Sequence, residues 1–329
     1  MLFLDNRGIT DPTLNLAMEE YALKNLDPEN TYFLFYINEP SIIIGKNQNT
    51  AEEINASYVN DNNIHVVRRL SGGGAVYHDL GNLNFSFITK DDGNSFHNFR
   101  KFTEPVIEAL KELGVNAELS GRNDILAEGR KISGNAQFST KGRMFSHGTL
   151  LFDSNIDEVV NALNVKLEKI QSKGIKSVRS RVANIKEFLK EDLTIQQFKD
   201  LLLESIFKEL GSIERYEWTE NDIKNIKELA EKRYRSWDWN YGKSPKCNIQ
   251  QSKRFAVGQI DIRLEVNKGV IEFVKIYGDF FGVGDVADIE QILIGTKFDK
   301  QEIENKLSEV DLKHYFGNVS IEEFMSLLF

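Results

Sequence analysis

Three consecutive glycines, Gly72 to Gly74, restrict the fold of this chain more than any other feature of its sequence. An apolar stretch that predicts a strand precedes them, and Ala75 to His78 again has the pattern of a strand. Such a run opposes a helix, adopts positive φ easily and brings backbone N–H groups close to a bound anion. A P-loop and a dinucleotide-binding fingerprint would both lead into a helix. The run therefore predicts a phosphate cradle between two strands, or an ordinary hairpin turn without a binding role.

Charged residues at two further places fit a site for phosphates. Arg69 lies shortly before the glycines and provides a fixed positive charge. Lys131 begins a predicted strand in the motif Gly-Arg-Lys-Ile-Ser-Gly-Asn-Ala, from which its ammonium can reach into a cleft. Asp124, in Gly-Arg-Asn-Asp, can hold a Mg²⁺ ion that bridges phosphates. Taken alone, these last two motifs are more typical of a surface hairpin with a solvated lysine.

A histidine and a basic segment follow along the chain. His147 opens an apolar strand, where a lone histidine is more often structural than catalytic. Lys173, Lys176, Arg179 and Arg181 form a basic cluster in a chain whose net charge is −9. The cluster can clasp a nucleotide or an acidic partner, although a solvated charge run is the usual interpretation.

The composition excludes several classes of protein. One cysteine rules out a disulfide framework and a Cys-based zinc cluster, and the five histidines include no close pair for an imidazole site. The negative net charge opposes broad nucleic-acid binding. The longest apolar stretch, residues 32–45, is interrupted by polar residues and is shorter than the about 20 residues of a membrane span. The N-terminus has no apolar signal segment, so we expect a cytoplasmic protein with no membrane or nucleic-acid partner.

Hydrophobic periodicity predicts an α/β fold. Asp11 and Pro12 begin a helix whose apolar positions recur at helical spacing as far as Ala22. Further helices are expected at residues 98–113, 157–163, 195–210, 220–233, 285–293, 300–307 and 320–328. Strands are expected at residues 32–36, 41–45, 65–69, 75–78, 83–88, 116–119, 123–127, 131–138, 145–152, 260–266 and 270–276. Strands and helices do not alternate regularly, which predicts a mixed sheet.

The sequence changes character after an aromatic segment, residues 237–241. Gly242 and Pro245 follow it and indicate the end of a first large unit. Beyond them, apolar and charged residues alternate from Ile260 to Val266, as in a half-buried strand of a small hairpin-plus-helices module. We therefore expect two domains, residues 1–245 and residues 246–329.

Taken together, these motifs resemble the lipoate–protein ligase family, and the resemblance covers nearly the whole chain. The motifs are Arg-Arg-Leu-Ser-Gly-Gly-Gly-Ala-Val-Tyr-His-Asp-Leu-Gly-Asn, Gly-Arg-Asn-Asp, Gly-Arg-Lys-Ile-Ser-Gly-Asn-Ala, His-Gly-Thr-Leu-Leu, Ser-Val-Arg-Ser-Arg-Val-Ala-Asn and Ser-Trp-Asp-Trp-Asn-Tyr-Gly. They occur in the order of the family. The aromatic after Gly-Ala-Val, often Phe in the family, is Tyr77 here.

The resemblance implies a fold and a reaction. The fold would be a biotin/lipoate ligase catalytic domain, with mixed β-sheets flanked by helices, followed by a small α+β C-terminal accessory domain. The enzyme would use ATP and Mg²⁺ to convert free lipoate into lipoyl-adenylate and pyrophosphate. It would then transfer the lipoyl group to a lysine of a lipoyl domain, on the E2 subunit of a 2-oxoacid dehydrogenase, or of glycine cleavage H protein. The reaction would serve lipoate salvage.

The resemblance also implies roles for individual residues. Lys131 would contact both the lipoate carboxylate and the α-phosphate, as an electrostatic clamp rather than a nucleophile. ATP would be held by Arg69, Gly74, Ala75, Val76, Tyr77 and Lys131. Lipoate would be held by Glu20, Ser71, His78, Lys131 and His147. The basic loop with Lys173, Arg179 and Arg181 would order over the adenylate, and Asp124 would be a Mg²⁺ ligand.

Three other functions remain open at this stage. A transferase of lipoyl or octanoyl groups on the same scaffold works without ATP through a cysteine thioester, but Cys247 lies away from every glycine motif. A biotin ligase shares the scaffold, although the glycine motif resembles the lipoate branch. A sensor that binds an acyl-adenylate without catalysis would not need Lys131 in its motif.

Overall fold

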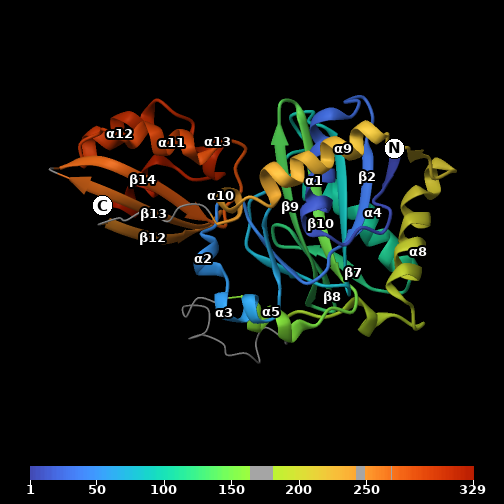
Figure 1. The fold of residues 1–329 in the computed structure, drawn as a ribbon. Helices are drawn as coiled ribbons and strands as arrows, with labels where there is room; N and C mark the ends of the chain where they lie inside the picture. The colour runs from blue at the N-terminus through green and yellow to red at the C-terminus, as the bar shows by residue number, and fades with distance from the viewer. Residues whose placement is uncertain (164–180, 242–248, 268) are drawn as a thin grey trace. The chain divides into compact units, whose positions relative to one another are not determined.

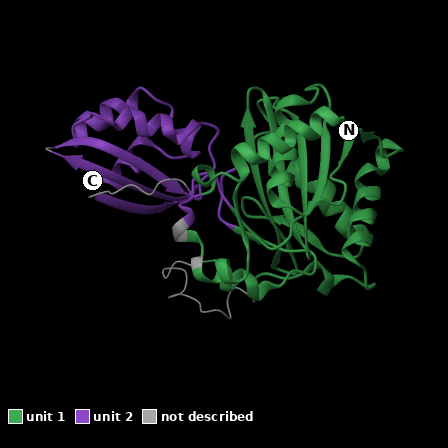
Figure 2. Ribbon diagram, viewed as in Figure 1, with its two compact units in different colours: residues 1–43, 51–68, 76–240 green, residues 44–50, 69–75, 241–329 purple. Residues whose placement is uncertain are grey.

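The computed structural model describes residues 1–163, 181–241, 249–267 and 269–329. Its contacts divide the chain into two units, coloured in Figure 2. The first contains residues 1–43, 51–68 and 76–240, and the second contains residues 44–50, 69–75 and 241–329. Two short stretches from the N-terminal half, one of which includes the glycine run, thus belong to the same unit as the C-terminal residues.

In the described chain, the first unit is built on an eight-stranded mixed sheet, visible in Figure 1. Its strands lie in the order β11-β1-β2-β6-β10-β9-β8-β7. β1 runs parallel to β2 and β11, whereas the pairs from β2 to β7 are antiparallel. The strands are β1 (Leu2–Asp5), β2 (Tyr32–Ile37), β6 (Asn82–Lys90), β7 (Ala117–Ser120), β8 (Asp124–Ala127), β9 (Arg130–Thr140), β10 (Arg143–Leu151) and β11 (Arg215–Tyr216).

A second, three-stranded sheet carries the residues on both sides of the glycine run. Its order is β4-β3-β5, formed by β3 (Ser41–Ile44), β4 (His65–Arg68) and β5 (Val76–His78). β3 and β5 are antiparallel, with Ser41 opposite His78. The glycine run is therefore the connection between two strands of one sheet, as the sequence predicted.

One face of the large sheet packs an apolar core. Alternate residues of β2 and β6, such as Phe33 and Phe85, point into it, since side chains alternate between the faces of a strand. Two helices cover this face with apolar residues, α4 (Phe99–Glu112) and α8 (Ile195–Phe207). Burial of the large aromatic side chains on this face stabilises the fold.

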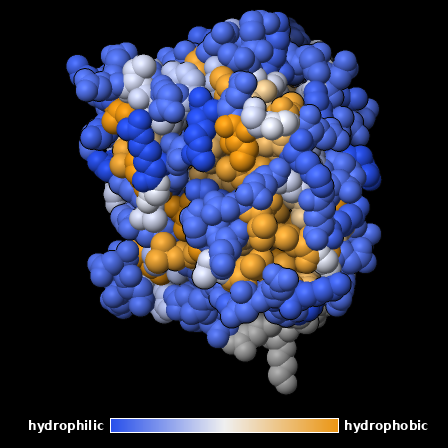
Figure 3. Space-filling view, turned by 90° about the vertical axis from the view of Figure 1, so that its right-hand side faces the viewer, coloured by the Kyte–Doolittle hydropathy of each residue, from blue (hydrophilic) through white to orange (hydrophobic). Residues whose placement is uncertain are grey.

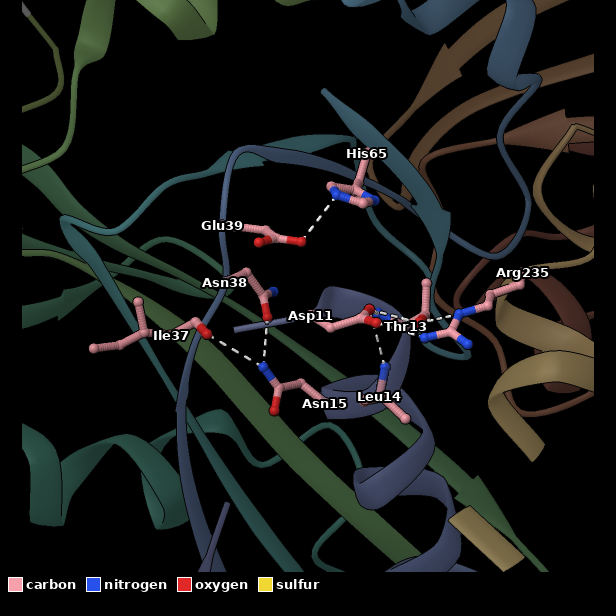
Figure 4. A network of polar contacts seen from close by, with 9 residues as sticks. All are labelled: Asp11, Thr13, Leu14, Asn15, Ile37, Asn38, Glu39, His65 and Arg235. Atoms are coloured by element: carbon pink, nitrogen blue, oxygen red, sulfur yellow. Dashed lines mark hydrogen bonds and ion pairs between the residues drawn. The ribbon is translucent and has the colours of Figure 1, made fainter. Parts of the chain in front are cut away.

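The opposite face is covered by α1 (Pro12–Asn25), which contacts β2, β6 and β10. Asp11 caps this helix by accepting hydrogen bonds from the backbone of Thr13, at 2.8 Å, and Leu14 (Figure 4). Arg235 donates to the second oxygen of Asp11 at 2.6 Å. α1 is buried nearly all round, including its polar residues Asn15, Glu19 and Glu20. Because buried polar groups need hydrogen-bond partners, this face of the sheet differs in kind from the apolar one.

Further elements pack around the first unit. A buried aspartate, Asp222, ties α9 (Glu220–Leu229) to α1 and β11 by accepting from the hydroxyls of Tyr21, at 2.7 Å, and Tyr216, at 3.0 Å. The remaining elements are α2 (Thr50–Glu53), α3 (Ala56–Asp61), α5 (Ile156–Ala162), η1 (Ile185–Phe188), η2 (Lys208–Leu210), η3 (Ala230–Tyr234) and α10 (Trp237–Asn240).

The second unit contains an antiparallel sheet in the order β12-β13-β14 and four helices in the described chain. One face of this sheet and the helices enclose an apolar core of its own. The free edge of β14 is partly covered, because Glu290 accepts from the backbone N–H of Ile276 at 2.9 Å and Asn47 accepts from that of Gly278. The elements are β12 (Ile249–Phe255), β13 (Gly258–Asn267), β14 (Val270–Gly278), α11 (Val286–Leu293), α12 (Lys300–Ser308), α13 (Leu312–Phe316) and α14 (Ile321–Leu328).

Hydrophilic residues form most of the surface seen in Figure 3, and hydrophobic residues show mainly in recesses between them. Among the described residues, the large hydrophobic side chains that stay exposed are Leu80, Leu201, Leu210, Trp237, Ile294 and Phe329. In the described part of the chain, no helix is both long and apolar enough to cross a membrane.

The structure confirms the mixed sheet, and the expected helices and strands occur with small shifts at their ends. The helix expected at 195–210 ends at Phe207 and continues as η2, and the helix expected at 220–233 ends at Leu229 before a π-helical turn. The pattern gave no sign of β1, β11, β12, α2, α3 and α13. Gly242 and Pro245 of the expected exit segment lie outside the described residues.

Candidate active site

The face of the large sheet beneath α1 carries a band of small and polar side chains. The strand registers place Ser86 of β6 opposite His147 of β10, and His147 opposite Ala136 of β9. In the next row, Asn84 lies opposite Thr149, whose hydroxyl accepts from the backbone N–H of Gly134 at 3.2 Å. Polar side chains therefore lie buried between α1 and this face of the sheet.

Lys131 lies at the start of β9, beside this band. Its Nζ is 2.7 Å from Oδ1 of Asp124, and both side chains are 38% exposed. A Cβ on Gly134 would stand 3.1 Å from Nζ, so glycine at this position leaves room for the lysine. The backbone of Lys131 donates to the carbonyl of Arg181 and accepts from the N–H of Ala183. The structure thus brings together three of the predicted site residues, Lys131, Asp124 and Arg181.

Asp124 alone offers little to a metal ion. Among the residues that the structure describes, no three His, Cys, Asp or Glu side chains are grouped to hold one. A Mg²⁺ ion bound there would depend on phosphate oxygens and water for its other ligands, as this ion usually does. Asp124 therefore fits a metal that arrives with a nucleotide better than a resident metal.

His147 forms a buried pair with Glu19. Its Nδ1 is 2.9 and 3.1 Å from the two carboxylate oxygens, and both side chains are nearly inaccessible. Because a carboxylate only accepts hydrogen bonds, Nδ1 carries the hydrogen and the ring orientation is set. The ring also packs against Phe145, with centroids 4.7 Å apart. His147 thus has a partner within the protein, as a structural histidine would, and its role in binding lipoate stays a prediction.

Glu20, which the resemblance assigned to lipoate, has other partners. Its carboxylate accepts from Lys24 at 2.6 Å and from the hydroxyl of Tyr234 at 2.7 Å, and it lies 3.1 Å from Arg233. Burial and the Glu20 carboxylate raise the pKa of Tyr234 well above its ordinary value, so the hydroxyl stays a donor. Glu19, one residue earlier, is the glutamate that reaches His147. The two glutamates point in different directions on α1, and the sequence alone gave no means of choosing between them.

The glycine run is shaped by Arg69 and lies in the second unit. Arg69 is almost fully buried, and its guanidinium donates to Ser71 Oγ at 3.0 Å and to the carbonyls of Gly72 at 2.6 Å and Gly74 at 2.9 Å. Arg69 therefore fixes the loop conformation in this structure. Ala75, another residue predicted to bind ATP, also lies in this unit.

The three glycines serve different needs. A Cβ on Gly72 would stand 2.4 Å from the carbonyl oxygen of Phe280, and one on Gly73, whose φ is +90°, would meet the ring of Phe281 at 2.8 Å. Gly74 has nothing within 4 Å of the same point. Gly72 and Gly73 are thus required by packing inside the second unit, and Gly74 is the position that stays open to a ligand.

β5, the strand after the glycine run, carries three further residues that were predicted to lie in the site, and all three belong to the first unit. Val76 and Tyr77 pair with Ile43 and Ile42, and burial raises the pKa of the Tyr77 hydroxyl. His78 is buried, with its Nδ1 3.0 Å from the amide nitrogen of Asn38. Lys173, Lys176, Arg179 and Cys247 lie outside the described residues.

Comparison with known proteins agrees with this architecture. Residues 11–207 match the family model of the lipoyl protein ligase A/B catalytic domain, and residues 244–328 match that of the bacterial lipoate protein ligase C-terminus. Lipoate-protein ligase LplJ of Bacillus subtilis is 64% identical, and lipoate–protein ligase 1 of Staphylococcus aureus is 60% identical, each over 100% of both chains.

Solved structures are similar as well. LipL1 of P. falciparum, in complex with lipoate, has a TM-score of 0.80 at 26% identity and covers 99% of this chain and 98% of its own. A lipoate-protein ligase A bound with ATP has a TM-score of 0.62 at 30% identity, covering 74% and 97%. A bipartite lipoate protein ligase of Thermoplasma acidophilum, described with its E2 lipoyl domain, has a TM-score of 0.67 at 31% identity, covering 75% and 98%.

Fold, site and relatives together define the class of this protein as a lipoate–protein ligase, an enzyme of protein lipoylation. The chain belongs to the lipoyl protein ligase A/B family, with the catalytic domain followed by the bacterial C-terminal domain.

Proposed function

We propose that this chain activates free lipoate with ATP and transfers the lipoyl group to a lysine of a lipoyl domain or of glycine cleavage H protein. The observation that carries the proposal is Lys131, whose partly exposed ammonium lies beside the polar band, 2.7 Å from Oδ1 of Asp124. ATP, lipoate and an E2 lipoyl domain accompany three related ligases, which supports the choice of substrates.

In the first step, an oxygen of the lipoate carboxylate attacks the α-phosphorus and pyrophosphate leaves. Both reactants are anions, so their approach needs a fixed positive charge. Lys131 supplies this charge, and Asp124 orients its ammonium until the anions bind. Mg²⁺, entering with ATP near Asp124, would neutralise the leaving pyrophosphate. Gly74, Ala75, Val76 and Tyr77 would provide backbone contacts to the nucleotide, next to the loop that Arg69 shapes.

In the second step, the amine of the acceptor lysine attacks the acyl carbonyl and AMP leaves. The mixed anhydride must be protected from water until then. Arg181, hydrogen-bonded to the backbone of Lys131, begins the described chain after the basic loop, and we propose that Lys173 and Arg179 of this loop cover the adenylate.

Lipoate has an apolar tail, and we propose that this tail lies along the band beneath α1. His147, held by Glu19, would contact it together with Glu20, whose carboxylate also accepts from Lys24 and Tyr234. Ser71 and His78 would lie toward the carboxylate end. Residues 1–245 would carry this site and residues 246–329 the accessory domain, in a cytoplasmic enzyme.

The proposal is tested by a mass gain on purified H protein and on a purified lipoyl domain, with lipoate, ATP and Mg²⁺ present and then omitted one at a time. We expect a lipoyl mass gain that requires all three, with pyrophosphate released in proportion. Transfer without ATP from an acylated donor protein, abolished by Cys247→Ser, would instead establish the thioester transferase. Pyrophosphate release without any acceptor modification would establish an adenylate-forming binding protein.

A further inference from the structure

A chain of buried asparagines leads from the first loop to His78. Asn6 donates to Oδ1 of Asn15 at 3.1 Å, Asn15 donates to Oδ1 of Asn38 at 2.9 Å, and the amide nitrogen of Asn38 lies 3.0 Å from Nδ1 of His78. All four side chains are at most 4% exposed. Water therefore does not replace any partner in these hydrogen bonds.

Backbone groups fix the orientation of the first side-chain amide in this series of hydrogen bonds. Asn6 accepts from the N–H of Gly8 and donates to the carbonyl of Ile9 at 2.8 Å, so its oxygen and nitrogen cannot be exchanged. The nitrogen of Asn15 faces the carbonyl of Ile9 at 3.0 Å and, as Figure 4 shows, that of Ile37 at 3.2 Å. Carbonyls only accept, so this atom of Asn15 is the amide nitrogen.

The orientation of the Asn15 amide then determines the orientation of the Asn38 amide. The atom of Asn38 that faces the Asn15 nitrogen must be its oxygen, because two amide nitrogens at 2.9 Å would both be donors. The nitrogen of Asn38 then faces His78 and donates to Nδ1. A neutral imidazole has one accepting and one donating nitrogen, so the hydrogen of His78 is on Nε2. A doubly protonated ring would set N–H against N–H at this contact.

We infer that Asn15 and Asn38 are positioning residues that hold His78 as the neutral Nε2–H tautomer, which donates a hydrogen bond to a carboxylate oxygen of the acyl substrate. This inference rests on the proposed function, and it deepens it. A donor fixed in advance stabilises the oxygen in the carboxylate and in the acyl carbonyl of the adenylate without any reorientation. His147 is held in the opposite tautomer by Glu19, so His78 and His147 differ in the nitrogen that carries the hydrogen.

The first measurement needs no variant. Long-range ¹H–¹⁵N spectra of the full protein with ¹⁵N-labelled histidine report which ring nitrogen is protonated, and loss of one set of signals in His78→Gln assigns them. We expect Nδ1 of His78 to be unprotonated and Nε2 protonated. A hydrogen on Nδ1 of His78 in the wild-type protein would overturn the inference.

Two variants then connect the tautomer with catalysis. Asn38→Asp places an acceptor opposite Nδ1 and should move the hydrogen there, and Asn38→Leu removes the donor without adding charge and should give a mixture of tautomers. We expect lipoate- and ATP-dependent pyrophosphate release to fall at least about tenfold in Asn38→Asp and less in Asn38→Leu, with folding checked by circular dichroism. Asn82→Asp is the matched control, because Asn82 is equally buried but donates to Asn84, at 3.0 Å, and not to a histidine. It should leave the His78 signals unchanged.

A loss of activity in either Asn38 variant while His78 keeps its hydrogen on Nε2 would refute the role of the tautomer. Absence of pyrophosphate release from the wild-type protein would instead overturn the proposed function and the catalytic part of this inference. Because the wild-type spectrum is independent of activity, the two failures can be told apart.

Discussion

The two faces of β10 show how this chain separates stability from chemistry. Met144 and Leu150 point into the apolar core under α4 and α8, within a cluster of buried hydrophobic side chains. His147 and Thr149, on the same strand, point to the face under α1, where Glu19 and a backbone N–H meet them. The period of a strand is two residues, so one segment supplies a packing surface and a binding surface. We expect substitutions on one face to change unfolding and those on the other to change turnover.

The largest effect should come from the apolar face. Leu150→Ala removes a fully buried side chain and leaves a cavity, so the free energy of unfolding should fall by about 2–5 kcal/mol. The volume-conserving control Met144→Leu should lose less than about 1.5 kcal/mol. Chemical denaturation measures both, and the activity of the folded Leu150→Ala enzyme should match the wild type. A specific loss of activity at low temperature would break the separation of the two faces.

Lys131→Ala should have the next largest effect, and on turnover alone. Removing one preorganised charge contact should slow lipoyl-adenylate formation by at least about a hundredfold. The free energy of unfolding should change by less than about 0.5 kcal/mol, because the side chain and its ion pair are partly exposed. The control is Arg130→Ala, which removes the neighbouring cation that pairs with Glu187. Equal losses of rate in both variants would mean that general positive potential, not the position of Lys131, matters.

The same contrast between stability and ligand binding is expected within the glycine run. Gly72→Ala should destabilise the second unit by about 1–3 kcal/mol, since its Cβ would meet the backbone oxygen of Phe280. Gly74→Ala has open space and should leave stability unchanged while the KM for ATP rises. Thermal unfolding and initial rates at varied ATP separate these outcomes. A Gly74 variant that unfolds as early as the Gly72 variant would remove the distinction.

The smallest effect concerns pH and the carboxylate that ties α9 to α1. Burial would raise the pKa of Asp222, but hydrogen bonds from Tyr21, Thr219 and Tyr216 outweigh it, and the pKa lies below its ordinary value. The folded state therefore binds the proton less tightly than the unfolded state, whose value is about 3.9. This contribution to stability is complete above that pH and is lost as the pH falls through the folded-state pKa.

Asp222→Asn should remove the contribution, so its unfolding midpoint should depend less on pH below about pH 4 than that of the wild type. Urea unfolding at several acidic pH values measures the difference. Parallel pH profiles for the two proteins would show that other carboxylates account for the acid sensitivity.

Much of the local structure was predictable because its signals are local. The cap at Asp11 and the proline after it place the start of α1 correctly, and Lys131 and Asp124 were both chosen from the neighbouring motifs that become β9 and β8. Strands paired across a short turn bring their residues together without help from the rest of the chain. The contact at 2.7 Å follows from that hairpin.

Other features depend on partners that are distant in sequence. The short strand β1 exists because it pairs with β2 and with β11, and neither pairing leaves a mark on its four residues. Glu19 and Glu20 are equivalent in pattern, and only the positions of β10 and η3 decide which one meets His147 and which one meets Tyr234. The asparagine chain is also invisible in the sequence, since Asn38 looks like a turn residue before a proline.

Residues 44–50 and 69–75 belong to the second unit. This affects when the glycine run can fold during synthesis. The hydrogen bond from Gly278 to Asn47 joins residues that leave the ribosome at very different times, and closing so long a loop is slow. Until the last strands and helices emerge, Gly72 and Gly73 lack the aromatic pair, Phe280 and Phe281, that covers them. The glycine run of a nascent chain therefore acquires its final conformation only when synthesis is nearly complete.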